Sequence, residues 1–241
     1  MALFTGSGVN SSPAGEVWYF FEQQMDYPVT LVPAENADRV NWKNYDVIIL
    51  PDGNYRFLGE KAVSEAIREW VNQGGKLIAI ENAVSQLSRN GWGLVPKSEG
   101  DRKKDSSREK TADYSRLRAY ENREKEFLMT STPGSIYRVD LDNSHPLAFG
   151  FPSYYYTLKQ DDNVYDFLSD GGWNVGVIKK DGYTSGFTGS KAKEKLRDAM
   201  VFGVQQMGRG AIIYLTDDPL FRNFWENGKL LFCNAVFMVG Q

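Results

Sequence analysis

The sequence has little of the chemistry on which most hydrolases depend. It contains one cysteine and one histidine in 241 residues. A single cysteine excludes an internal disulfide bond, although it does not settle the compartment. A catalytic zinc ion usually takes two or three imidazole ligands together with a carboxylate. One histidine therefore excludes a zinc hydrolase within this chain, and we expect no metal site.

A long hydrophobic run and a strong net charge are also missing. The longest apolar stretch, Leu230 to Val239, is about half of the ~20 residues that a membrane-spanning helix requires, so no membrane span is expected. A net charge of -3 gives no long-range field for phosphate backbones, so we expect no nucleic-acid partner. The start, Met1 to Gly6, lacks the features of a signal peptide. It indicates either a cytoplasmic protein or a fragment cut at a domain boundary, and we favour the fragment.

What the sequence does have is a regular alternation of apolar runs and helical patterns in its first third. Strands that alternate with helices predict an α/β fold with a doubly wound, mostly parallel sheet. Ligands of such sheets bind beyond the carboxyl ends of the strands. The predicted strands are Ala2–Phe4, Val29–Val32, Asp46–Leu50 and Leu77–Ile80, and the predicted helices run from about Pro13 to Met25 and from about Glu60 to Asn72.

The remainder of the chain has a different texture. Residues of about 97–133 carry dense charges of both signs, which favours a solvated excursion over a binding segment. A segment of about 134–190 is rich in strand-forming residues. The pattern then returns to α/β with a buried strand at Ala211–Leu215 and a closing helix at Lys229–Val239. We expect one domain over residues 1–241, with the charged stretch as an insertion.

The most informative single residue is Glu81, which stands where the strand Leu77–Ile80 runs into a helix. Such an elbow exposes one side chain at the top of a sheet, where a serine or cysteine can act as a nucleophile. A carboxylate cannot form a thioester. If Glu81 has a chemical role, it is that of a general acid or base, or of a ligand for a cation or hydroxyl. The structural alternative is that helix-start amides at Asn82 and beyond satisfy it.

Three other polar segments follow predicted strands. The loop Gly6–Pro13 can cradle an anion but matches no phosphate-binding pattern, so turn and cap duty is favoured. Pro51–Arg56 is equally typical of a tight turn and of a pocket lining. The aspartates of Asp217–Arg222 suit acid/base or metal chemistry, but Asp-Asp-Pro favours a helix start. The candidate cleft residues are Ser7, Asp52, Asn54, Tyr55, Arg56, Glu81, Asn82, Asp217, Asp218 and Arg222.

Nucleophilic catalysis by the single thiol is not expected. Cys233 lies in an apolar helical context, in which a thiol is usually a small core residue. His145 is the only imidazole that a Cys-His or Ser-His pair could use, and it remains a candidate. The run Tyr154–Tyr156 alternates across a predicted strand, so one of its faces is core and the other a platform or interface.

Six segments stand in a recognisable order: Thr5–Val9, Gly15–Trp18, Leu50–Arg56, Gly74–Glu81, His145–Leu147 and Gly228–Ala235. In this order they resemble the class I glutamine amidotransferase-like domain that lies carboxy-terminal to the catalytic domain in a group of bacterial zinc carboxypeptidases. The resemblance covers nearly the whole chain, and it implies a flavodoxin-like, class I glutamine amidotransferase-like fold. A more distant similarity extends to ThuA-like proteins and to a domain of some β-galactosidases.

The chain lacks the catalytic residues of active amidotransferases and also those of zinc carboxypeptidases. Active amidotransferases of this fold carry Gly-x-Cys-x-Gly at the elbow, and here the aligned residues are Ala79–Ala83, with Glu81 in place of the cysteine. Glutaminase activity is therefore not implied. The zinc motif of the carboxypeptidases, His-x-x-Glu with a distant histidine, is absent from this chain. The zinc implied by the resemblance would belong to an amino-terminal carboxypeptidase domain of the same polypeptide.

The resemblance thus implies a non-catalytic accessory domain of a secreted or periplasmic zinc carboxypeptidase. Such a domain would orient the peptidase, bind its peptide or glycan substrate, or mediate assembly. Two alternatives stay open. One is a stand-alone hydrolase or lyase that uses Glu81, with Asp52, Asp218 or His145, on a small polar or sugar-like substrate. The other is a carbohydrate-binding module that uses exposed tyrosine or tryptophan faces.

Overall fold

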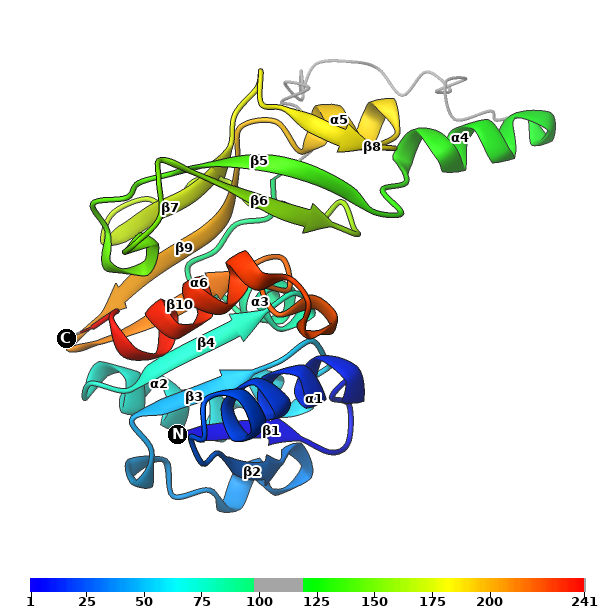
Figure 1. Ribbon diagram of the computed structural model, residues 1–241. Helices are drawn as coiled ribbons and strands as arrows, with labels where there is room; N and C mark the ends of the chain where they lie inside the picture. The colour runs from blue at the N-terminus through cyan, green and yellow to red at the C-terminus, as the bar shows by residue number, and fades with distance from the viewer. Residues whose placement is uncertain (98–118, 241) are drawn as a thin grey trace.

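A computed structural model of the chain describes residues 1–97 and 119–240, and its central feature is a ten-stranded sheet (Figure 1). The strand order is β2-β1-β3-β4-β10-β9-β7-β5-β6, with β8 paired to β5. The first five strands in this order are parallel: β2 (Thr30–Pro33), β1 (Ala2–Thr5), β3 (Val47–Leu50), β4 (Lys76–Ile80) and β10 (Gly210–Leu215).

The other half of the sheet is antiparallel and extends the parallel half through the pair of β10 and β9. In Figure 1 it stands above the parallel half. Its strands are β9 (Ala199–Met207), β7 (Gly172–Ile178), β5 (Ser135–Leu141), β6 (Tyr154–Lys159) and β8 (Thr184–Gly186).

Helices cover both faces of the parallel half (Figure 1). Alternate strand residues point to opposite faces, so Ile48 and Ile49 belong to different cores. One face packs against α1 (Ser11–Tyr19), its π-helical continuation η1 (Phe20–Gln24) and α6 (Glu226–Phe237). The opposite face packs against α2 (Lys61–Asn72) and α3 (Asn82–Arg89).

The remaining helices are short. Two of them, α4 (Arg123–Thr130) and α5 (Ser190–Lys195), pack together beside the antiparallel half. The 3-10 turns are η2 (Ala34–Arg39), η3 (Trp42–Asn44), η4 (Arg56–Gly59), η6 (Tyr120–Asn122), η7 (Pro146–Ala148) and η8 (Phe221–Asn223).

The predicted α/β fold class, with its doubly wound and largely parallel central sheet, is confirmed. The helix predicted from about Glu60 lies at Lys61–Asn72. The strand β9 was not predicted; its apolar run is interrupted by Gly203 and ends in two glutamines, which weakens the strand pattern. Most of the charged stretch predicted at about 97–133 lies outside the described residues, and its last part forms η6 and α4.

The prediction of a helix start at Asp217-Asp218-Pro219 is wrong. The chain after β10 forms an irregular turn, then η8, and α6 begins only at Glu226. Asp217 binds groups on β6. Asp218 contacts Glu16 of α1, and its Oδ1 also accepts the Leu220 amide at 2.8 Å, which closes a local turn in place of a helix start.

Within the described ranges 1–97 and 119–240, no helix has the length and apolar character to cross a membrane.

Candidate functional site at the elbow after β4

The elbow between β4 and α3 places Glu81 in a conformation that glutamate rarely adopts. Its backbone has φ of 50° and ψ of -115°, and a positive φ costs on the order of 1–3 kcal/mol for a residue with a side chain. Hydrogen bonds hold it there. The Glu81 amide donates to the Leu215 carbonyl of β10 at 2.9 Å, and the Glu81 carbonyl accepts from the Val84 amide at 3.0 Å. The sheet and the first turn of α3 thus fix the elbow together.

The Glu81 carboxyl group is held in its neutral form by its surroundings. Burial raises the pKa of Glu81 to about 8, and the negative charges of Asp52, Asp217 and Asp161 add to this effect, while Lys159 opposes it. The helix-start amide of Asn82 does not satisfy Glu81, because it donates to Asp52 Oδ1 at 3.1 Å. At neutral pH most Glu81 side chains therefore carry a proton.

Asp52 ties three strand ends together. Its buried carboxylate accepts the Asn82 amide of α3 and the side-chain amide of Asn10, which precedes α1. Both neighbours come from loops at the carboxyl ends of parallel strands, where the sequence predicted a site. Asn10 was not among the predicted residues. An asparagine just before a helix is typical of a helix cap. Nothing in the sequence indicates that the Asn10 side chain contacts Asp52 at the end of β3, 42 positions away.

The strongest charge pair of the region joins the two halves of the sheet. Lys159, at the end of β6, is fully buried, and its Nζ lies 2.7 Å from Asp217 Oδ1 and 3.1 Å from Asp161 Oδ1. The Thr157 hydroxyl donates to Asp217 Oδ2 at 2.7 Å. Burial lowers the pKa of Lys159, but the two aspartates outweigh it and hold that pKa above its usual value. Lys159 is thus a permanent cation inside the protein.

A second pair of acidic residues is formed by Glu16, on the buried face of α1, and Asp218, which follows β10. Burial, then the hydrogen bond and negative charge of Glu16, raises the pKa of Asp218 to about 9. Glu16 is itself buried, with Oε1 accepting from the Ser12 hydroxyl at 3.1 Å. At neutral pH the Asp218 carboxyl group therefore carries a proton. Sequence reasoning missed Glu16, because a glutamate in a surface-like helical pattern reads as exposed.

We call Glu16, Asp52, Glu81, Asp217, Asp218 and Lys159 the elbow cluster. Within it, the carboxyl groups of Glu81 and Asp218 have raised pKa values, and the backbone of Glu81 is strained. The side chain at the elbow is a carboxyl group instead of a thiol or hydroxyl. In the described residues there is no group of three or more histidine, cysteine, aspartate or glutamate side chains placed to hold a metal ion.

The other predicted residues lie outside this cluster. Tyr55 is buried, and its hydroxyl donates to the Pro51 carbonyl at 2.7 Å. Arg222 is exposed beside the ring of Phe221. His145 accepts the Leu147 amide through Nδ1 at 3.1 Å and packs near Trp173 of β7. The electrostatic partners of Glu81 do not include His145.

Two open cavities lie among the loops that follow the parallel strands, and no residue of the elbow cluster lines either of them. One of about 250 Å³ includes Asn10, Asn54 and Asn82 in its lining, with Ser85, Gln86 and Arg89 of α3. Glu81 is not part of this lining. The other, of about 510 Å³, takes Ser7, Asn54 and Arg56 from the predicted residues. The structure therefore divides the predicted cleft residues between a buried cluster and an open surface.

The fold is that of known glutamine amidotransferase-like and ThuA-like proteins. A putative GMP synthase subunit from Thermoplasma acidophilum superposes with a TM-score of 0.57 at 10% identity, covering 98% of this chain and 92% of the other. A putative ThuA-like protein from Bacteroides uniformis gives 0.54 at 13% identity, over 98% and 88% of the two chains. A glutamine amidotransferase from Thermotoga maritima gives 0.53 at 9% identity, over 98% and 97%.

Neither a protein-family model nor a curated protein sequence matches the chain. At these identities the structural likeness establishes the fold alone.

Proposed function

We propose that this chain is a non-catalytic domain of a larger zinc carboxypeptidase, which it serves by binding substrate, by positioning the catalytic domain or by assembly. The observation that supports this most is the side chain at the elbow. A fold whose active members use a thiol at this place here carries a glutamate that is largely protonated at neutral pH. The carboxypeptidase part of the proposal rests on the resemblance of the sequence segments described above.

In this proposal the chemistry belongs to an amino-terminal catalytic domain of the same polypeptide, which holds the zinc ion, in a secreted or periplasmic setting. The coding sequence upstream of Met1 tests it directly. An in-frame segment with His-x-x-Glu and a later histidine is the expected finding. An in-frame stop codon immediately before Met1 would contradict the carboxypeptidase context.

The non-catalytic part needs its own test. The purified chain, assayed with glutamine, amide and peptide substrates, is expected to give no turnover above a buffer control. Robust hydrolysis that Glu81→Gln abolishes and the exposed control Glu65→Gln leaves intact would overturn this part, whatever the upstream sequence contains.

A second candidate function is favoured by a specific observation, the strained elbow with a carboxyl pKa near 8. A carboxyl group of this kind suits general acid or base work at neutral pH, on a small polar or sugar-like substrate. Its signature would be a pH-rate profile with an inflection near pH 8 that Glu81→Gln removes. A flat profile in an active preparation would rule out this use of Glu81.

A further inference from the structure

The larger open cavity lies at the point where the order of the parallel strands reverses. From β1 the chain continues into β2 on one side and later returns to β3 on the other. In open α/β sheets the crevice beyond the carboxyl ends at such a point is the usual place for a ligand. Here it measures about 510 Å³, in the range of small-molecule sites. We call it the switch-point cavity; Ser7, Glu35, Asp38, Asn54, Arg56, Phe57 and Glu60 are among the residues that line it.

The backbone around the cavity is tightly built. Gly8 has φ of +85°, and a Cβ atom there would lie 2.3 Å from the Asn54 carbonyl oxygen. The Asn54 amide donates to the Gly8 carbonyl at 2.7 Å. On the β2 side, the Ser7 amide donates to Glu35 Oε2 at 3.0 Å. The three loops are therefore held together before any ligand arrives, which lowers the entropy cost of binding.

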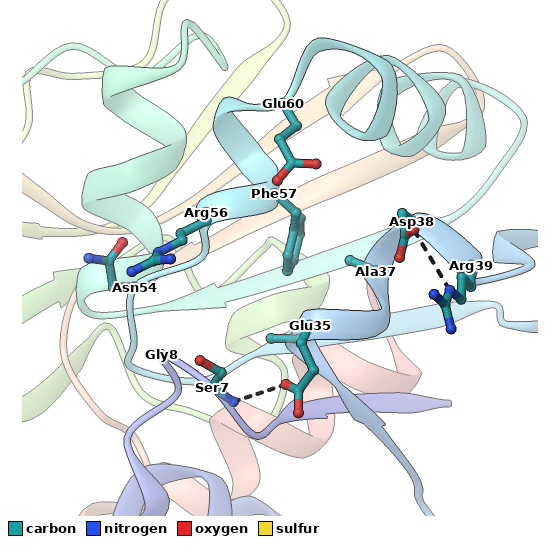
Figure 2. Close-up of a pocket in the computed structure, with 11 residues that line it drawn as sticks. Ser7, Gly8, Glu35, Ala37, Asp38, Arg39, Asn54, Arg56, Phe57 and Glu60 are labelled. Carbon is teal, nitrogen blue, oxygen red and sulfur yellow. Dashed lines mark hydrogen bonds and ion pairs between the residues drawn. The ribbon is translucent and has the colours of Figure 1, made fainter.

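Charges of both signs line this cavity, which has two arginines and three carboxylates in its wall. Figure 2 shows the Arg56 guanidinium next to Asn54 at one end of the cavity, Asp38 together with Arg39 at the other end, and the Glu60 carboxylate beside Phe57 between them. Within the described part of the chain, the side chains of Arg56 and Glu60 have neither an ion pair nor a hydrogen bond with protein groups. Asp38 has only a long contact of 3.9 Å to the adjacent Arg39.

The lining also has an apolar part. Phe57, Ala34 and Ala37 contribute to it and are otherwise buried in the core. The three carboxylates of Glu35, Asp38 and Glu60 outnumber the two arginines, Arg39 and Arg56, so the lining has a net negative charge that disfavours a phosphate or another polyanion. A ligand that matches all of these features carries a carboxylate, a separate ammonium group and an apolar side chain.

We propose that the switch-point cavity binds a small zwitterion, a free α-amino acid or a dipeptide with an apolar side chain. The ligand's carboxylate binds Arg56 and Asn54, its ammonium group binds Glu60 and Asp38, and its side chain packs against Phe57. A planar guanidinium recognises a carboxylate through paired hydrogen bonds, and charge-assisted bonds of this kind are the strong ones. This inference does not depend on a carboxypeptidase context, although free amino acids are what a carboxypeptidase releases.

Isothermal titration calorimetry tests the proposal with defined probes. We expect saturable binding of L-leucine or L-leucyl-L-leucine, and the stronger of the two identifies the free amino acid or the dipeptide as the ligand class. N-acetyl-L-leucine lacks the ammonium group and L-leucinamide lacks the carboxylate. Each is expected to bind at least about tenfold more weakly than L-leucine, as the loss of a charged hydrogen bond implies.

Two variants place the ligand in this cavity. Arg56→Gln and Glu60→Gln are each expected to weaken binding at least about tenfold. Matched exposed controls, Arg209→Gln at the opposite end of the strands and Glu65→Gln on α2, should leave the affinity unchanged. Three results would overturn the proposal: no heat with either zwitterion, equal affinity for the blocked derivatives, or binding only of a neutral disaccharide such as cellobiose.

Discussion

The elbow cluster and the switch-point cavity lie at the same edge of one parallel sheet. The cluster combines carboxyl groups with one lysine, and the cavity combines carboxylates with two arginines, Arg39 and Arg56. In the elbow cluster, Lys159 has no solvent exposure and two aspartates within 3.1 Å. In the switch-point cavity, Arg56 is exposed and has no protein partner among the described residues. Similar charged residues thus have different roles in the two places. A buried charge must be paired for the protein to fold, whereas an exposed charge without a partner is free to bind a ligand.

This comparison separates stability from recognition. Changes in the elbow cluster should alter the free energy of unfolding and its pH dependence. Changes to the side chains of the cavity should alter binding and leave folding nearly intact. Four substitutions test the two halves of this statement, in order of decreasing effect on stability.

The largest effect is expected at Lys159. Lys159→Met removes the cation and leaves Asp217 buried and unpaired, which should cost about 3–5 kcal/mol of unfolding free energy. Urea denaturation at pH 7 measures it. The control Lys195→Met breaks the more exposed pair with Asp162, at 2.7 Å, and should cost less than about 1 kcal/mol. Equal losses in the two variants would contradict a special role of the buried pair, and adding Asp217→Asn to Lys159→Met should restore part of the stability.

The next effect concerns pH. The pKa of Glu81 is raised from 4.5 to about 8 by folding, so the folded state holds a proton that the unfolded chain has released. Stability is therefore lost as pH rises from about 4.5 to about 8, by on the order of 2–4 kcal/mol. In Glu81→Gln this loss should shrink, leaving the part due to Asp218 and Asp217, whose pKa values burial also raises. Unfolding free energies at pH 5 and pH 8 measure the slope, with Glu65→Gln as the control; an unchanged slope in Glu81→Gln would mean that the glutamate is ionised in the folded protein.

A smaller loss is expected from the frame of the cavity. Gly8→Ala places a Cβ atom against the Asn54 carbonyl in a conformation with positive φ, at a cost of about 1–3 kcal/mol. Gly15→Ala is the matched control, because a Cβ at Gly15 of α1 meets nothing within 4 Å. It should stabilise the protein by about 0.5–1 kcal/mol. Melting temperatures that shift in the same direction for both variants would show that the two loops are not locked together.

The smallest effect should come from the side chains of the cavity themselves. Arg56→Gln is expected to change the free energy of unfolding by less than about 0.5 kcal/mol, because the guanidinium is exposed and has no partner to lose among the described residues. Urea denaturation of this variant, beside the calorimetry described above, completes the comparison. A loss above about 2 kcal/mol would place Arg56 in the folding framework instead of a binding surface.

The sequence alone was sufficient for the parallel half of the fold. Runs such as Val47–Leu50 and Leu77–Ile80 are buried on both faces and bounded by glycine or polar turns, so their identity as strands is local information. The elbow at Glu81 followed from the same pattern. The antiparallel half was harder, because β9 contains Gly203 and two glutamines, and only pairing with β10 and β7 makes it a strand.

The buried charge pairs of the elbow cluster could not be predicted from local sequence patterns. A lysine at the end of β6 reads as a solvated residue, and its burial depends on Asp217, which lies 58 positions further along the chain. Glu16 was missed for the same reason, since its partner Asp218 follows the last parallel strand. For Asp217 and Asp218 a local rule, the helix start, was applied where long-range partners determine the structure.

The contact of Lys159 with Asp217 has a consequence for how relatives of this chain can diverge. The cation comes from the antiparallel extension and the anion from the end of β10, so Asp217 loses its buried cation when the extension is removed, whereas Lys159 still has Asp161 of its own half. The Trp225 indole, which precedes α6, also donates to the Tyr156 carbonyl of β6 at 3.1 Å. We therefore expect position 217 to depend on position 159: a descendant that loses the extension, or the lysine, must also neutralise the aspartate, and a relative that keeps Asp217 without Lys159 should be rare.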